Sequence, residues 1–165
     1  MNIRFQTPLL FVKDVKGSRA FYENILQQKI EYDFGEDVVF HGGFAIHDAN
    51  HISQLLFKRP NPFIDDNLGK ENFELYFECD DLDGIFSQLV DQKVVFIHTV
   101  KEQPWGQRVF RFYDPDNHIV EIGEPMPIVI RRFLTAGASE TEVAKRTSMP
   151  IVEIVKIKSE IDNNI

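Results

Sequence analysis

An internal repeat constrains the fold of this chain more than any other feature. The segment VKDVKG at positions 12–17 resembles CDDLDG at positions 79–84, at an offset of 67 residues. Further along each copy, QKIEY at 28–32 resembles QKVVF at 92–96, at an offset of 64. The second copy has therefore lost about one helical turn. The chain is predicted to contain two similar modules in tandem.

Each module is predicted to fold as a βαβββ unit. Apolar and polar side chains alternate over 73–79, which is typical of a strand with one buried face. In the helix that follows, apolar residues recur with helical spacing from Leu82 to Val90. The predicted strands are 5–12, 30–34, 38–47 and 52–57 in the first module, and 73–79, 94–100, 108–113 and 118–123 in the second.

These elements predict an α+β fold. Two tandem βαβββ modules should form a curved sheet with an inner cavity, and their helices should lie outside. The domain is expected to span 1–125, with modules at about 1–57 and 72–124 joined by the proline-containing linker 58–70. Residues 126–165 are expected to form a small helical C-terminal extension.

The composition indicates a globular protein of the cytoplasm. Cys79 is the only cysteine and cannot form an internal disulfide, so a reducing compartment is expected. No apolar run is long enough to span a membrane. The net charge of −8 argues against a broad surface for nucleic acid or for anionic lipid.

Glu121 stands among apolar neighbours in the last predicted strand, where a carboxylate requires a cation, a metal or strong donors. Because the helices should cover the more apolar face of each sheet, Glu121 is expected to point into the cavity. A three-residue loop ending at Asn117 would place Arg111 directly opposite Glu121. Arg111 is therefore the first candidate to meet this carboxylate.

The repeat extends this argument to a set of four residues. An offset of 67 relates Thr7 to Glu74 and Gln54 to Glu121. These four side chains are predicted to form a pseudo-symmetric quartet, with two members from each module.

The motif FYDPDNHIVEIGE at 112–124, together with Val12-x-Asp14-x3-Ser18-x2-Phe21-Tyr22, resembles the vicinal oxygen chelate superfamily. That superfamily includes glyoxalase I, fosfomycin-resistance enzymes, bleomycin-resistance proteins and extradiol dioxygenases. The resemblance covers roughly residues 3–124 and implies the same βαβββ repeat. It also implies a divalent metal held by one residue in the first strand and one in the last strand of each module. Those positions fall on Thr7, Gln54, Glu74 and Glu121.

The chain departs from this family pattern. Glyoxalases and fosfomycin enzymes typically have His or Glu where this chain has Thr7, and His where it has Glu74. An extradiol dioxygenase needs two His and one carboxylate for iron, and the quartet contains no His, so that activity is not expected. An oxygen-only site would suit magnesium, manganese or calcium. Arg111 would instead satisfy Glu121 without any metal.

Three functions follow from these residues. The favoured hypothesis is a metal-free protein that binds an anionic or aromatic small molecule, with contacts from Arg111, Tyr76, Tyr113, Trp105, Gln54 and Thr7. The alternative is a glyoxalase-like lyase or isomerase, with Glu121 or Glu74 as base and one divalent metal on Glu74, Glu121 and Gln54. By the family resemblance, a homodimer is expected in either case.

The third hypothesis concerns the C-terminal extension. Helices are predicted at 129–136, 140–147 and 150–158, with Ser139 as an N-cap. The phrase SETEVAKRTSMPIVEIVKI resembles a helix-turn-helix, which would suit a ligand-responsive regulator. The third helix offers few donors to read bases, however, so docking against the protein is expected rather than binding to nucleic acid.

Three histidines resemble a zinc cluster at first sight. His41, His47 and His51 are interrupted by Gly42-Gly43 and by Asp48-Ala49-Asn50, so they are expected to be exposed loop residues without a shared metal. His98 is expected to lie in a strand near Glu102 as a hydrogen-bonded residue rather than a general base.

Overall fold

The computed structural model describes residues 3–62, 64 and 68–163. The chain divides into two compact units. The first unit comprises Met1–Glu74 with Tyr113–Ile119, and the second comprises Leu75–Phe112 with Val120–Ile165. Each unit is described by itself below.

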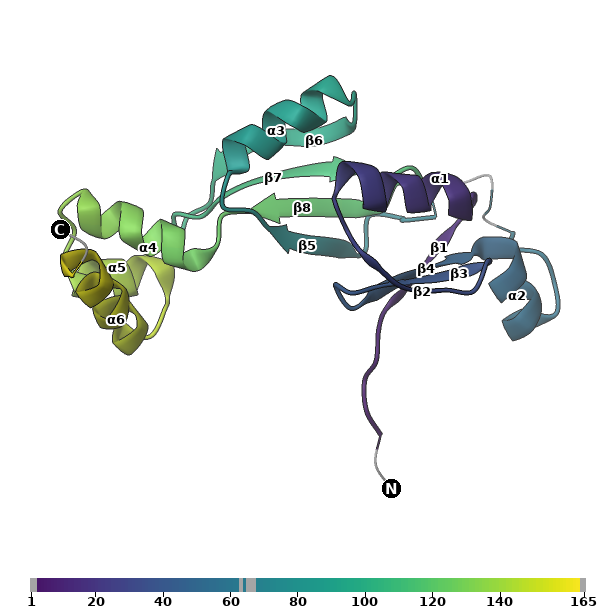
Figure 1. Cartoon of the computed structure of the whole chain (residues 1–165), viewed down its shortest axis with the longest axis horizontal. Helices are drawn as coiled ribbons and strands as arrows, with labels where there is room; N and C mark the ends of the chain where they lie inside the picture. The colour runs from purple at the N-terminus through teal and green to yellow at the C-terminus, as the bar shows by residue number, and fades with distance from the viewer. Residues whose placement is uncertain (1–2, 63, 65–67, 164–165) are drawn as a thin grey trace. The chain divides into compact units, whose positions relative to one another are not determined.

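The first unit contains one βαβββ module (Figure 1). Its elements are β1 (Leu9–Val12), α1 (Val15–Ala20), the π-helical turn η1 (Phe21–Ile25), β2 (Ile30–Asp33), β3 (Asp37–Phe40), β4 (Phe44–Asp48) and α2 (Ala49–Phe57). The sheet order is β1-β4-β3-β2, with β1 parallel to β4 and the other pairs antiparallel. The predicted βαβββ pattern is confirmed.

Two strand predictions for this module are wrong in detail. The segment 38–47 forms two strands, because Gly42 and Gly43 turn the chain and Gly43 has a φ of 81°. The segment 52–57 lies in helix α2. Asp48 starts this helix by accepting a hydrogen bond from the amide of His51 at 2.7 Å, so the chain leaves the sheet before Ile52.

The DPDN motif closes the core of the first unit. Tyr22 is fully buried against the rings of Phe40 and Phe44, and its hydroxyl donates to the Asp114 carboxylate at 2.7 Å. Asp116 accepts from the Ser18 hydroxyl at 3.2 Å and from the Lys13 amide at 3.1 Å. Burial, and secondarily the charge of Asp114, raises the pKa of Asp116. The motif therefore fixes helix α1 and the end of β1 by hydrogen bonds.

The second unit contains the other βαβββ module. Its elements are β5 (Glu74–Glu78), α3 (Leu82–Asp91), β6 (Val95–Glu102), β7 (Arg108–Tyr113) and β8 (Ile119–Gly123), and the sheet order is β5-β8-β7-β6. Asp81 caps α3, accepting from the amide of Gly84 at 2.9 Å. Phe86 of α3 packs on the rings of Phe96 and Phe110, which shows that the helix covers the apolar face of the sheet.

Three helices follow the second sheet, as predicted, in α4 (Met126–Thr135), α5 (Glu140–Thr147) and α6 (Ile151–Asp162). Their own small core consists of Ile130, Val143, Ile154 and Ile157. Ser139 caps α5 in a reciprocal capping box with Glu142. None of the helices within the described ranges is both long and apolar enough to cross a membrane.

Candidate functional site

The carboxylate of Glu121 forms an ion pair with the guanidinium of Arg111. Hydrogen bonds from the Asp114 amide to the His118 carbonyl at 3.0 Å, and from the Glu124 amide to the Arg108 carbonyl at 3.0 Å, fix the register of β7 and β8. This register places Arg111 opposite Glu121, so the predicted contact is confirmed. Glu121 is 8% exposed in its side chain and Arg111 is 27% exposed, so the pair presents its cationic side to solvent.

His98 of β6 lies on the other side of Arg111. Its Nε2 is 3.3 Å from Nη1 of Arg111, and its Nδ1 is 2.8 Å from the carbonyl oxygen of Thr99. Because a guanidinium can only donate, Nε2 accepts and Nδ1 carries the ring proton. A line of Glu121, Arg111 and His98 thus crosses three adjacent strands, and it fixes the direction of the guanidinium.

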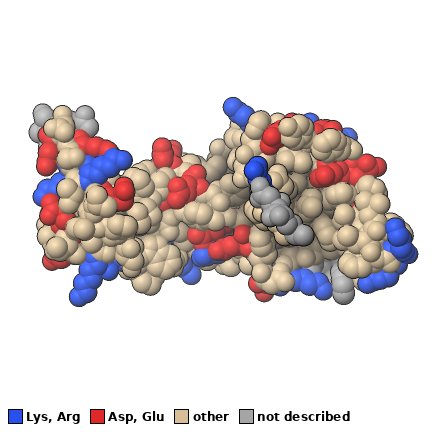
Figure 2. All heavy atoms as spheres, turned by 90° about the horizontal axis from the view of Figure 1, so that it is seen from below, with Lys and Arg blue, Asp and Glu red and all other residues tan. Residues whose placement is uncertain are grey.

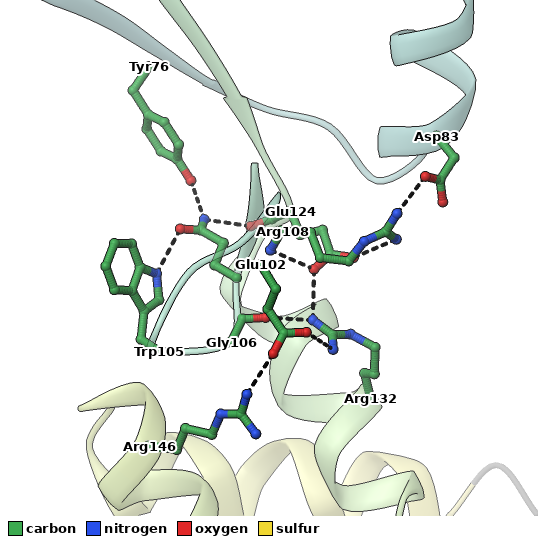
Figure 3. Close-up of polar contacts among 10 residues, drawn as sticks. Tyr76, Asp83, Glu102, Trp105, Gly106, Arg108, Glu124, Arg132 and Arg146 are labelled. Carbon is green, nitrogen blue, oxygen red and sulfur yellow. Dashed lines mark hydrogen bonds and ion pairs between the residues drawn. The ribbon is translucent and has the colours of Figure 1, made fainter. Parts of the chain in front are cut away.

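The expectation for His98 is confirmed, since it is a partly buried, hydrogen-bonded residue of β6. Glu102, at the end of β6, pairs with Arg132 at 3.1 Å and with Arg146 at 2.6 Å rather than with His98 (Figure 3). Glu102 therefore joins α4 and α5 to the second sheet. The same two arginines also contact the ring of Phe133, with their guanidinium carbons 5.1 Å and 4.4 Å from its centroid.

A second polar group on this sheet consists of Tyr76, Gln107 and Trp105 (Figure 3). The Gln107 side-chain amide donates to the Tyr76 hydroxyl at 2.7 Å, and its carbonyl accepts from the Trp105 indole at 3.0 Å. Gly123 leaves the space for this arrangement, since a Cβ there would lie 3.1 Å from both Gln107 and Tyr76. The two aromatic rings are 46% and 40% exposed, so they form a surface that a planar molecule can contact.

The hydroxyl of Tyr76 also donates to Glu78 at 3.0 Å. Burial of the hydroxyl, with the hydrogen bond to Glu78 as the next contribution, raises the pKa of Tyr76 to about 12. At neutral pH Tyr76 is therefore a neutral donor and acceptor and cannot serve as a base.

Gln107 was not predicted as a site residue. It is buried, and besides its contacts with Tyr76 and Trp105 it donates to the Glu124 carbonyl at 2.8 Å. One signal was present in the sequence, since Gln107 and Arg111 are four residues apart and strand alternation places both on one face.

The remaining predicted site residues lie in the first unit. Thr7 precedes β1, and its hydroxyl donates to the Gly43 carbonyl at 3.0 Å. Gln54 is an exposed residue of α2 rather than a residue of the last strand, so the repeat did not relate it correctly to Glu121. Glu74 is the exposed first residue of β5. The hydroxyl of Tyr113 donates to the Glu71 carboxylate.

His41 lies in an exposed turn as predicted, but His47 and His51 differ from the prediction. His47 is a buried residue of β4, and His51 lies in the first turn of α2, so neither occupies a loop. Their rings are in contact, with Nε2 of His47 3.1 Å from Nδ1 of His51. Asp37 is paired with His47 across the sheet at 3.9 Å.

Within the part of the chain that the structure describes, no three His, Cys, Asp or Glu side chains gather closely enough to hold a metal ion. Glu121, the carboxylate that the family pattern would give to a metal, has a guanidinium as its partner.

Comparison with known proteins agrees with this fold. A family model described as a glyoxalase-like domain matches residues 5–127. The crystal structure of a protein of unknown function from Agrobacterium tumefaciens str. C58 is 41% identical, with 76% of this chain and 96% of that chain covered and a TM-score of 0.69.

Two more distant structures share the fold. One is a glyoxalase/bleomycin resistance protein/dioxygenase from Nocardioides, with 18% identity, 75% and 85% of the two chains covered and a TM-score of 0.59. The other is the fosfomycin resistance protein FosX from Listeria monocytogenes, complexed with Mn(II) and sulfate, with 19% identity, coverage of 81% and 99% and a TM-score of 0.57. No curated protein sequence matches the chain. The chain belongs to the glyoxalase-like domain family of the vicinal oxygen chelate superfamily.

Proposed function

We propose that this protein binds a small aromatic anion without a metal, on the polar face of the second sheet. The observation that carries the proposal is the ion pair between Arg111 and Glu121. The buried Glu121 carboxylate holds the guanidinium in place by this ion pair, while part of Arg111 stays exposed to solvent. A ligand carboxylate would meet the exposed part of Arg111.

The aromatic preference rests on Tyr76 and Trp105. Both rings are about half exposed, and Gln107 holds both by hydrogen bonds, so little side-chain entropy is lost when a flat ligand packs on them. The catalytic alternative has less support. The Glu121 carboxylate is paired with Arg111, and the raised pKa of Tyr76, about 12, keeps its hydroxyl protonated near neutral pH.

Trp105 provides the experiment, because it is the only tryptophan of the chain. Phenylacetate and phenylacetamide have the same shape and differ in charge. Phenylacetate should change the Trp105 fluorescence in a saturable way and phenylacetamide should do so far more weakly. Arg111→Gln should weaken phenylacetate binding about tenfold or more, since a charge-assisted contact is lost.

Arg131→Gln is the matched control, because Arg131 pairs with Glu160 on the helices that follow the sheet. It should bind phenylacetate as the parent protein does. Equal binding of the charged and the neutral compound, or equal loss in both variants, would contradict the proposal. Metal analysis of protein purified without chelator tests the metal-dependent alternative directly.

A role in DNA binding is not supported by the third helix of the extension. The exposed residues of α6 include Ile151, Val152 and Val155, which cannot read base edges by hydrogen bonds. On the face that Figure 2 shows, basic side chains stand singly or in small groups among acidic ones and form no continuous basic surface.

We further propose that the protein forms a homodimer in the cytoplasm. In the segment before β1, Ile3 and Phe5 are 87% and 82% exposed, which is unusual for large apolar side chains. Sedimentation velocity of the parent protein and of an Ile3→Ser/Phe5→Ser variant tests the dimer. A parent protein that sediments as a monomer at tens of micromolar would contradict it.

A further inference from the structure

A cavity of about 490 Å³ lies within the first unit, apart from the residues that carry the proposed function. Its wall is formed by β1, by helix α2, by the segment that follows α2, and by His118 of the DPDN loop. The volume is in the range of cavities that hold small organic molecules. None of Thr7, Gln54, Glu74 or Glu121 is among the described residues that line it.

Two buried polar side chains interrupt its largely apolar wall. Ser53 is 2% exposed, and its hydroxyl has no hydrogen-bond partner. A hydroxyl that loses water without gaining a partner is unfavourable, so a polar atom of a bound molecule would be favoured beside Ser53.

His118 is the other buried polar group, with 6% exposure. Its Nδ1 lies 2.9 Å from the Asp114 carboxylate, which also accepts from Tyr22 and from the amide of Asp116. Because the carboxylate only accepts, Nδ1 carries a proton, and in the neutral ring Nε2 is then an acceptor. Ser53 and His118 together can receive a hydrogen-bond donor from a bound molecule.

The charged side chains among the described lining residues, apart from His118, are both cationic. Arg59 and Lys70 line the cavity, and no Asp or Glu is among its described lining residues, in a chain of net charge −8. Arg59 lies over the ring of Phe57, with 5.4 Å from its guanidinium carbon to the ring centroid. This stacking directs the cation along the apolar wall.

The backbone around Lys70 is held in an unfavourable conformation. Lys70 and Glu71 have φ angles of 48° and 52°, a region that residues with side chains rarely adopt in succession. The neighbouring Gly69 donates to the Asp116 carbonyl at 3.2 Å, and Glu71 accepts from the Tyr113 hydroxyl. Contacts on both sides therefore fix Lys70 at the wall of the cavity.

We propose that this cavity is a binding site for an amphipathic anion that carries a hydrogen-bond donor on its apolar body. The apolar part would fill the space beside Phe57 and Phe73, and the donor would reach Ser53 or His118. The acidic group would meet Arg59 and Lys70. This site is additional to the one on the second sheet.

Two fluorescent probes test the charge requirement. 8-Anilinonaphthalene-1-sulfonate is an apolar anion with one N–H donor, and N-phenyl-1-naphthylamine is the same molecule without the sulfonate. The anion should bind the parent protein with one-to-one stoichiometry and about tenfold or more tightly than the neutral compound, as expected for a charge-assisted contact. Backbone amide NMR shifts should change at Ser53, Gly69 and His118.

Three variants separate the parts of the proposal. Arg59→Gln/Lys70→Gln should reduce the affinity for the anion to the affinity for the neutral probe. Lys16→Gln/Lys29→Gln is the control, because it makes the same change in charge on exposed residues that do not line the cavity. It should leave the affinity for the anion unchanged. Ser53→Phe should block both probes by filling the space. Arg111→Gln should leave the anion bound, which distinguishes this site from the proposed site on the second sheet.

The opposite results would overturn the proposal. Equal affinity for the two probes would contradict the proposal that the ligand is an anion. Equal effects of the two double variants would contradict it as well. Shifts confined to residues of the second unit, or no binding at all, would show that the cavity is not a binding site. Since Arg59 and Lys70 are exposed side chains, their variants should fold even if Ser53→Phe does not.

Discussion

The hydroxyl of Tyr22 donates a hydrogen bond of 2.7 Å to the carboxylate of Asp114, 92 residues later in the chain. Both side chains are buried, and Asp114 keeps three other donors. We expect Tyr22→Phe to lower the free energy of unfolding by about 1.5–3 kcal/mol, the usual loss for a hydrogen bond to a charged group. Urea denaturation followed by circular dichroism measures it.

Tyr32→Phe is the control for this experiment. Tyr32 is 54% exposed and stacks on Phe34, and no hydrogen bond is described for its hydroxyl. Its loss should change the free energy of unfolding by less than about 0.5 kcal/mol. Similar effects of the two substitutions would mean that the Tyr22 hydroxyl contributes nothing specific.

The fold could be predicted well where local chemistry and long-range repeat agree. Asn117 has a φ of 65°, as the predicted hairpin loop requires, and this single turn fixes the register that brings Arg111 to Glu121. The alternation of Glu74, Leu75 and Tyr76 likewise predicts which side chains of β5 are exposed, and only Leu75 of the three is buried.

The wrong predictions in the first module have local causes, which comparison of the two repeat copies could not show. Residues 52–57 are apolar enough for a strand. They form part of a helix instead, because Asp48 caps helix α2 one turn earlier. Extending the 67-residue offset across that helix moved Gln54 into the predicted quartet. His47 and His51 meet because a strand passes directly into a helix between them, an arrangement that neither helical nor strand periodicity describes.

The second prediction concerns Gly69. A Cβ at this residue would lie 2.0 Å from the carbonyl oxygen of Asn117, which is backbone and cannot rotate away. Gly69→Ala should therefore destabilise the first unit by about 3 kcal/mol or more, as overpacking against a fixed group does. Thermal denaturation by calorimetry measures the loss.

Gly42→Ala is the matched control, because its nearest neighbour is the flexible end of Gln28 at 3.2 Å. It should cost less than about 1 kcal/mol. A Gly69→Ala protein as stable as Gly42→Ala would show that the segment around Gly69 does not pack against the DPDN loop.

The third prediction concerns the coupling of Arg111 with Glu121. In a double-mutant cycle with Arg111→Gln and Glu121→Gln, we expect a coupling energy of about 1–3 kcal/mol, because Glu121 is largely withdrawn from water. The same cycle on Arg131 and Glu160, whose side chains are 40% and 44% exposed, should give about 0.5 kcal/mol or less. Equal couplings would contradict the buried character of the first pair.

The last prediction uses the raised pKa of Tyr76, about 12 against the ordinary value of 10.0. Between these two values the folded protein keeps a proton on Tyr76 that the unfolded chain releases. The stability associated with this group is therefore fully present below pH 10 and is lost as the pH rises toward 12. Absorbance at the wavelength of tyrosinate should show one group titrating near pH 12 that is absent in Tyr76→Phe. Tyr32→Phe should keep that late titration. If Tyr76→Phe instead removes a group that titrates near 10.0, the hydroxyl of Tyr76 is not buried and hydrogen-bonded to Glu78 in solution.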